Sequence, residues 1–440
     1  MTAPDFTVDV FQNEYLPVRA REVNAIVTVR SGGTAAEGPA AAPSAAEIII
    51  IDRSGSMGMS IDPERSMLVP MAKLDMACRA AGAAVDVIRD GVAFAVIAGS
   101  RRARAIYPED GTLAIAGANT REAAKSSLAR LSAGGGTAIG NWLLLARQIF
   151  QTREDTLRHA ILLTDGQNMQ FPGRLAAAIR QCEGLFRCDC RGVGTDWNVD
   201  ELRKISTALL GSVDIVPDPS GLAADFEAMM QASMAKEIAD VMLRVWVPQH
   251  ARVRFIKQVA PAVEDLTSRR TQPQAPQAGD YPTGAWGNES RDYHLCVDVE
   301  PGAIGQEMLA ARVSLIVNTA SGPQTLGQGL ARAIWTEDEE LSTRISRHVA
   351  HYTGQAELAQ AIQDGLEARK AGDEGTATAR LGTAVALAHG SGNEDTARLL
   401  AKVVDVIDPG TGTIRLKGKV AAADEMALDT RSAKTVRVRP

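Results

Sequence analysis

The strongest constraint on the fold is the regular alternation of strand patterns and helix patterns between residues 47 and 239. Apolar runs typical of strands occupy residues 47–52, 92–98, 102–107, 159–164, 186–193 and 213–216. Helical spacing of apolar residues, with capping signals such as Thr120, is found at residues 70–88, 120–131, 139–150, 175–182, 199–209 and 223–239. Such alternation predicts an α/β domain with a doubly wound, mostly parallel sheet covered by helices on both faces.

The segments on either side of this α/β region have a different, antiparallel strand pattern. Strand-like stretches are found at residues 6–30, 241–247, 253–259, 294–299 and 311–317, and a Gln- and Pro-rich stretch at 267–290 is expected to form a long exposed loop. Polar and apolar residues alternate from Leu243 to Val247, which is typical of a sheet with one buried face. We therefore expect one β-sandwich, with the α/β domain inserted into it.

From Asp338 the pattern becomes helical, with expected helices at residues 341–352, 355–371, 373–389 and 393–407. Gly372-Asp373 and Gly392-Asn393 each pair a helix stop with the N-cap of the next helix, which predicts a C-terminal helical bundle. The predicted domains are 1–46 (N-terminal strands of the sandwich), 47–240 (α/β), 241–335 (the rest of the sandwich), 336–408 (helical bundle) and 409–440 (a flexible tail).

Composition excludes several classes of protein. A hydrophobic content of 45% and a formal net charge of -6 among 440 residues are ordinary for a globular protein and give no global attraction to nucleic acid or anionic membranes. No signal peptide or apolar span of membrane length is apparent. The five cysteines are an odd number, which fits a reducing compartment. We expect a cytoplasmic protein.

Polar residues follow two of the apolar strands, where ligands bind in open α/β sheets. Asp52, Ser54 and Ser56 come directly after the apolar run at residues 48–51, and Asp165 follows another apolar strand. Thr137 follows three consecutive glycines that let the main chain approach a ligand closely. These two carboxylates and three hydroxyls form an oxygen-only set that suits Mg²⁺, with Mn²⁺ or Ca²⁺ as alternatives, and disfavours zinc.

The sequence also contains three other candidate ligand sites, one for phosphate and two for zinc, and each lacks a residue that its chemistry needs. A phosphate-binding loop has a Lys after its glycines and follows a strand. The glycine loop at residues 134–136 has no such Lys and is expected to follow a helix. Cys182, Cys188 and Cys190 have no fourth ligand at zinc spacing, so they are expected to be buried small side chains. His348 and His351 lack the Glu of a His-Glu-x-x-His zinc motif.

The sequence resembles von Willebrand factor type A (VWA) domains of the bacterial type. The resemblance is carried by residues 52–56, 135–137 and 164–166, which are similar to the three segments of the metal-ion-dependent adhesion site (MIDAS) of these domains. The resemblance covers residues 47 to about 235 and implies a Rossmann-like VWA fold. It further implies that Ser54, Ser56 and Thr137 contact the cation directly or nearly so, while Asp52 and Asp165 act largely through water. An open coordination position would then accept an acidic side chain of a partner.

The resulting hypothesis is a divalent-metal-dependent protein–protein interaction module, not an enzyme, whose unknown protein ligand presents Asp or Glu. A hydrolase would need a general base beside the metal, and no candidate is apparent in the sequence. An alternative is a regulatory subunit of an ATPase or chelatase-type complex, since the chain has no ATPase motif of its own. A phosphopeptide-binding partner of the tail, reading Thr430 or Thr435 after phosphorylation, is a further expectation.

Overall fold

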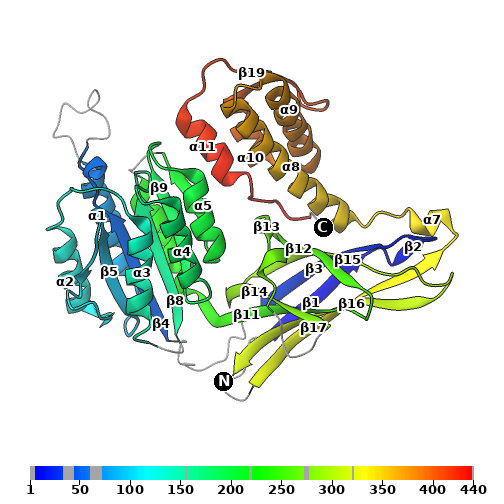
Figure 1. The fold of residues 1–440 in the computed structure, drawn as a ribbon, viewed down its shortest axis with the longest axis horizontal. Helices are drawn as coiled ribbons and strands as arrows, with labels where there is room; N and C mark the ends of the chain where they lie inside the picture. The colour runs from blue at the N-terminus through cyan, green and yellow to red at the C-terminus, as the bar shows by residue number, and fades with distance from the viewer. Residues whose placement is uncertain are drawn as a thin grey trace. The chain divides into compact units, whose positions relative to one another are not determined.

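The computed structural model describes residues 5–32, 44–59, 72–153, 156–217, 221–271, 277–319 and 322–438. Contacts divide the chain into two compact units, of which the first comprises Met1–Ala40 with Ile238–Pro440 and the second Ala41–Glu237 (Figure 1). The Gly-, Ala- and Pro-rich stretch at residues 31–46, whose composition is typical of a surface loop or short linker, lies mostly outside the described residues. Its ends belong to strands, because β3 (Glu22–Gly32) continues to residue 32 and β4 (Ala45–Asp52) starts at residue 45.

The second unit is built around a seven-stranded sheet in the order β10-β9-β8-β4-β5-β6, with β7 paired to β5. Its strands are β4, β5 (Ala93–Gly99), β6 (Ala103–Tyr107), β7 (Ala114–Ile115), β8 (Leu157–Thr164), β9 (Arg187–Val193) and β10 (Val213–Val216). The pairs from β10 to β5 are parallel, whereas β6 and β7 run antiparallel to β5. The predicted mostly parallel sheet is confirmed, and its one strand that the sequence did not predict is β7, which is two residues long.

Helices cover both faces of this sheet (Figure 1). They are α1 (Lys73–Val87), α2 (Ala118–Leu128), α3 (Ile139–Phe150), α4 (Pro172–Cys182), α5 (Val199–Ala208) and α6 (Leu222–Met234). Helices α1, α2 and α6 contribute to one core with Ile49 and Ile51 of β4, because alternate residues of a strand face the same side of a sheet. Helices α3 and α4 contact each other, as do α4 and α5.

Two helix predictions in this unit were wrong in detail. Thr120 is not an N-cap, because α2 begins at Ala118 and the Thr120 hydroxyl instead accepts a hydrogen bond from the Gly117 amide (2.9 Å). The last helix ends at Met234 and not at residue 239, because residues from 236 onward form strand β11 (Lys236–Trp246) of the first unit's sheet. The predicted start of the first helix at Pro70 lies outside the described residues.

The first unit contains two five-stranded sheets, in the orders β1-β3-β15-β12-β13 and β14-β11-β16-β17-β2. The strands not yet given are β1 (Asp5–Gln12), β2 (Tyr15–Pro17), β12 (Arg252–Ala260), β13 (Glu264–Asp265), β14 (Ala278–Gly287), β15 (Ser290–Asp298), β16 (Glu307–Thr319) and β17 (Gly322–Thr336). Buried side chains from both sheets form one hydrophobic core. Strand β3 pairs with β15, so segments that flank the second unit in sequence share one sheet.

The expectation of a long exposed loop at residues 267–290 was wrong for most of that stretch. Residues 278–287 form β14, which pairs into the sheet and buries Tyr281 and Trp286. Strand β17, 15 residues long, was missed altogether. Both strands carry glycines that weaken the alternation from which strands are predicted.

The helical part comprises α7 (Glu339–Ser342), α8 (Arg347–Lys370), α9 (Glu374–Ser391) and α10 (Glu394–Val403). The predicted stop and cap pairs are confirmed, since Asp373 and Asn393 accept hydrogen bonds from the Thr376 and Thr396 amides (3.0 and 3.1 Å). Helices 341–352 and 355–371 were predicted separately but largely form the single helix α8. The last predicted helix ends early, because residues from 404 form β18 (Val404–Asp408), which pairs with β19 (Thr413–Leu416).

The tail is not a flexible extension, so that prediction was wrong. It contains α11 (Ala422–Arg431), and the residues after α11 bond to the end of β12 and the turn that follows it. The Val263 amide donates to the Ala433 carbonyl (2.7 Å), and the Thr435 hydroxyl donates to the Val259 carbonyl (2.6 Å). Residues 435–438 are not a strand. Apolar residues such as Leu428 are buried in the helical core, and this burial holds the tail in place.

Candidate metal centre

The candidate site lies at the carboxyl end of β4 and its neighbour β8. The chain passes from β4 to β5 on one side and later returns to β8 on the other, so this edge is a topological switch point, where open α/β sheets bind ligands. Asp52 ends β4 and is fully buried. Its Oδ1 accepts from the Ser54 amide (2.7 Å) and its Oδ2 accepts from the Thr164 hydroxyl at the end of β8 (2.6 Å).

Three of the predicted side chains are joined by hydrogen bonds. The hydroxyls of Ser54 and Ser56 lie 3.0 Å apart, and the Ser56 hydroxyl donates to Asp165 Oδ1 (2.7 Å). Ser54 and Asp165 are buried, and Ser56 is partly exposed. A short 3₁₀ helix (Gly55–Gly58) curls the chain after Ser54, and the Ser56 hydroxyl contacts both Ser54 and Asp165.

Thr137 joins the same site from the glycine loop. A side chain built at Gly166 would place its Cβ 3.5 Å from both the Ser56 and the Thr137 hydroxyl oxygens, so the two hydroxyls lie beside the same glycine. The glycine loop also pairs with the β4 loop, since the Gly55 amide donates to the Gly135 carbonyl (2.9 Å). Gly135 has a φ of 91°, which favours glycine at this position.

Trp142 of helix α3 holds the loop that carries Thr137 against the sheet. Trp142 packs directly on Gly99, where an added Cβ would lie 2.4 Å from the indole ring. The indole Nε1 donates to the Ser100 carbonyl (2.6 Å), and that carbonyl also accepts from the Ala138 amide (3.2 Å). The loop that carries Thr137 is therefore held against the end of β5 by a buried tryptophan.

Lys73, at the first position of α1, was missed by the sequence analysis. Its ammonium group lies 2.9 Å from Asp165 Oδ2 and 3.7 Å from Asp196, and its side chain is only 12% exposed. A cation at a helix N-terminus opposes the helix dipole, and this was the signal in the sequence that could have pointed to a carboxylate partner. Lys73 and Ser56 together hold both oxygens of Asp165.

The electrostatics of Asp52 fit a nearby cation. Burial raises the pKa of Asp52 to about 6, which the hydrogen bonds from Thr164 and Ser54 only partly oppose, and the charge of Asp165 adds to the rise. Within the described residues Asp52 forms no ion pair, so its negative charge is stabilised by hydrogen bonds alone. A divalent cation near Asp52 would favour its ionised form.

The donor set itself fits a hard cation. The structure brings together all five predicted side chains, Asp52, Ser54, Ser56, Thr137 and Asp165, and they offer only oxygen atoms. Across the residues that the structure describes, no group of three or more His, Cys, Asp or Glu side chains has metal-binding geometry. This arrangement can hold Mg²⁺ with few direct charges.

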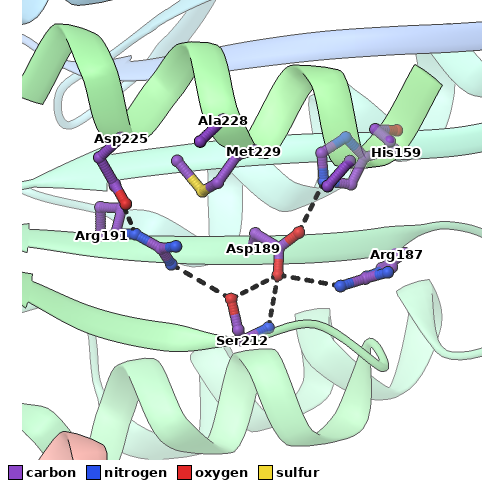
Figure 2. A pocket seen from close by; sticks show the side chains of 10 residues that line it. His159, Arg187, Asp189, Arg191, Ser212, Asp225, Ala228 and Met229 are labelled. Atoms are coloured by element: carbon purple, nitrogen blue, oxygen red, sulfur yellow. Dashed lines mark hydrogen bonds and ion pairs between the residues drawn. The ribbon is translucent and has the colours of Figure 1, made fainter. Parts of the chain in front are cut away.

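A second polar cluster lies at the opposite, amino-terminal end of the strands (Figure 2). His159 Nδ1 lies 2.7 Å from Glu47 Oε2, and its Nε2 lies 2.9 Å from Asp189 Oδ2. Burial disfavours the charged imidazole, but the two carboxylates outweigh it and raise the pKa of His159 to about 9. Figure 2 shows Ser212 on the side of Asp189 away from His159, where it donates to Asp189 Oδ1 (2.7 Å).

This second cluster does not have the geometry of a catalytic site. A cavity of about 280 Å³ adjoins it. Both ring nitrogens of His159 face carboxylates and Ser212 contacts Asp189 instead of His159, so the imidazole has no nitrogen left to accept a proton from a nucleophile. The contacts of Ser233 with Glu47 (2.7 Å) and of Asp225 with Arg191 (2.6 Å) instead join α6 to the sheet.

The remaining candidate ligands behave as expected for structural residues. All five cysteines are free thiols, and Cys182, Cys188 and Cys190 are buried. The Cys188 and Cys190 sulfurs lie 4.0 Å apart on β9. The His351 ring lies 2.8 Å from the Val436 carbonyl, and the His348 ring stacks on Phe11, so neither histidine forms part of a metal-binding group in the described chain.

Comparison with known proteins decides the family. Residues 48–167 match the profile of the von Willebrand factor type A domain, and residues 386–432 match the profile of a von Willebrand factor type A C-terminal domain. The solved structure of a von Willebrand factor type A protein from Catenulispora acidiphila is 50% identical, with a TM-score of 0.92 over 99% of this chain and 98% of that chain. This chain belongs to the von Willebrand factor type A family.

A more distant structure shares the fold of this VWA protein. The ArnB paralogue VWA2 from Sulfolobus acidocaldarius has a TM-score of 0.58 at 14% identity, over 98% of both chains. Among curated proteins no sequence matches significantly. The C-terminal profile runs across residue 408, where the helical bundle and the tail were expected to divide. No helix in the described part of the chain has the length and apolar character needed to cross a membrane.

Proposed function

We propose that this VWA protein is a divalent-metal-dependent protein–protein interaction module of the MIDAS type. In this proposal Asp52, Ser54, Ser56, Thr137 and Asp165 hold Mg²⁺, or Mn²⁺ or Ca²⁺ in its place. The cation supplies an electrophilic position that an Asp or Glu side chain of a partner can occupy. The observation that carries the proposal is the convergence of these five oxygen-bearing side chains at the switch point of the sheet.

The residues of the chain have distinct roles in this proposal. The hydroxyls of Ser54, Ser56 and Thr137 would contact the cation, since neutral ligands leave most of its charge available to a partner's carboxylate. Asp52 and Asp165 would stabilise it largely through water. Lys73 holds Asp165 in place and lowers the net negative charge of the site.

The surroundings support binding more than catalysis. The histidine of this unit, His159, lies at the other end of the sheet and has carboxylates on both nitrogens. Among the side chains whose contacts at the site are described, none is a base aimed at the cation position, which a metal-dependent hydrolase would need. The free cysteines agree with a cytoplasmic protein, and the proposal further includes that the protein is of bacterial type.

Affinity capture with a matched pair of variants tests this function. Wild type, Thr137→Ala and Ser132→Ala would be used as baits, each with Mg²⁺ and with EDTA. Ser132 is an exposed hydroxyl in the same loop, so its variant controls for loss of a side chain without loss of a ligand. We expect partners that require Mg²⁺ and are retained by Ser132→Ala but lost with Thr137→Ala. Identical partners from all three baits, with or without EDTA, would contradict the proposal.

The capture also separates the alternatives. Recovery of an ATPase as the Mg²⁺-dependent partner would favour a regulatory subunit of a chelatase-type complex. A phosphopeptide-binding protein that is recovered independently of Thr137 would point to the tail. Phosphorylation of Thr430 or Thr435 requires its hydroxyl to break a hydrogen bond first. The two hydroxyls donate to the Met426 and Val259 carbonyls (2.8 and 2.6 Å).

A further inference from the structure

Large apolar side chains are exposed around the candidate metal centre. In the second unit the exposed large apolar residues among those described are Met59, Ile115, Met169 and Phe171. Ile115 lies on β7, which pairs with the amino-terminal end of β5. The other three follow the site segments of β4 and β8 and are 60%, 68% and 80% exposed. Exposed apolar groups are therefore concentrated at the metal end of the sheet.

Two of these residues, Met59 and Met169, are hydrogen-bonded to the ligand loops. The Met59 amide donates to the Ser56 carbonyl (3.0 Å), and the Met169 amide donates to the Thr137 carbonyl (2.8 Å). The Met169 sulfur lies 2.8 Å from the position that a Cβ of Gly136 would take, so it packs over the glycine loop. Methionine is unbranched and adapts to different partner shapes, which suits an exposed contact surface.

Two arginines flank the same glycine loop. Arg53 Nη1 lies 3.9 Å from a Cβ built at Gly134, and Arg101 Nε lies 3.2 Å from one built at Gly136. Arg53 also donates to the Ser132 carbonyl (3.0 Å). Neither arginine forms an ion pair with any residue whose position is described. The chain as a whole has a formal net charge of -6, so this positive charge is local. Two guanidinium groups without an ion pair among the described residues favour an incoming carboxylate.

Two carboxylates near the site already contact other groups of the chain. Asp196 faces Lys73 (3.7 Å), and Glu201 of α5 accepts from the Asn168 amide (3.2 Å). A negatively charged partner is therefore favoured beside Arg53 and Arg101 and disfavoured beside Glu201. Apolar contact area and positive charge coincide at Gly136, where Met169 and Arg101 both pack.

We propose that Met59, Met169 and Phe171 with Arg53 and Arg101 form a specificity rim for a linear segment of a partner protein that carries two acidic residues and a bulky apolar residue. This inference rests on the proposed function. One carboxylate of the segment completes the coordination of the cation, and a second pairs with Arg101 or Arg53. The apolar side chain, Phe or Leu, covers Met169 and Phe171 and removes their surface from water. The rim thus selects among acidic partners that the cation alone would not distinguish.

Selection from a displayed library of random short peptides tests the rim. Peptides would be bound to the full-length wild-type protein in Mg²⁺ and released with EDTA. We expect the released pool to be enriched in sequences with two acidic residues and an aromatic residue or Leu within a few positions of each other. A released pool with acidic residues but without apolar enrichment would overturn the proposal, and so would an empty pool from a protein that binds Mg²⁺.

Variants then assign the selection to the rim. Met169→Ser with Phe171→Ser should weaken an enriched peptide at least tenfold, whereas Ile115→Ser, an exposed apolar change at the far end of the sheet, should leave its affinity unchanged. Arg101→Ser should weaken that peptide severalfold and have no effect on a version whose second acidic residue is replaced by Ser. Equal peptide affinity in the double variant and wild type would overturn the rim.

Calorimetric titration with Mg²⁺ alone distinguishes failure of the rim from failure of the proposed metal site. We expect unchanged Mg²⁺ affinity in every rim variant, which also shows that the variants are folded. If wild type itself does not bind Mg²⁺, the proposed function fails and the rim fails with it. If Mg²⁺ binds but the rim variants select the same peptides as wild type, only the rim fails.

Discussion

Replacement of His159 by Gln should remove a specific pH dependence of stability from the second unit. The pKa of His159 is raised from an unfolded value of 6.5 to about 9 in the folded chain, where burial is outweighed by Glu47 and Asp189. Such a group stabilises the fold fully below pH 6.5, and this contribution is lost as the pH rises through about 9. A shift of this size corresponds to roughly 3 kcal/mol, or more than a hundredfold in the folding equilibrium.

Hydrogen exchange measured peptide by peptide is a suitable assay, because the two units need not unfold together. The exchange rates are first corrected for the intrinsic effect of pH. The protection of the β8 amides in wild type should then fall by about a hundredfold or more between pH 6.5 and 9.5. In His159→Gln protection should be lower at pH 6.5 and lack that slope, since two buried carboxylates lose their shared donor.

His294 provides the control for this prediction. It is a buried histidine whose pKa is lowered to about 4, mainly by burial and also by Lys257, so it is neutral in folded and unfolded chains above pH 7. His294→Gln should therefore leave the slope of β8 unchanged. The same slope in wild type and in His159→Gln would refute the assignment of a charged imidazole between Glu47 and Asp189.

Two further substitutions test other parts of the structure. Lys73→Met removes the positive charge beside Asp165, so calorimetry should show Mg²⁺ affinity about tenfold higher. Lys125→Met, a change at a half-buried paired lysine, should leave the affinity unchanged. Unchanged or weaker binding in Lys73→Met would contradict this prediction. Tyr352→Phe removes the hydroxyl that donates to the buried Asp292 (2.5 Å), so urea unfolding should show the first unit destabilised by about 1–3 kcal/mol, and an unchanged midpoint would contradict it.

The α/β region was predictable because its signals are local. The apolar residues 48–51 require a buried strand, and a parallel sheet with helices on both faces is the arrangement that buries such strands. The candidate site followed from the same logic, since Asp52 and Asp165 both come at strand ends that meet at one edge of the sheet. The structure places the two next to the predicted hydroxyls.

Other parts depended on contacts that local patterns do not specify. Residues 236–239 continue the helical spacing of apolar side chains but form the start of β11, because tertiary pairing outweighs propensity. The tail residues 422–431 look polar, yet α11 buries Leu428 against other helices. Lys73 and Met169 lie in separate segments of the sequence and are brought to the site only by the fold.

The most direct test of the account is the location of a bound cation by anomalous scattering from crystals grown with Mn²⁺. We predict one strong peak at about 2–2.5 Å from the hydroxyl oxygens of Ser54, Ser56 and Thr137, with Asp52 and Asp165 just beyond them. Absence of a peak there at saturating Mn²⁺, with Lys73 still on Asp165, or a peak only elsewhere in the molecule, would contradict the central claim that these five side chains form a metal centre.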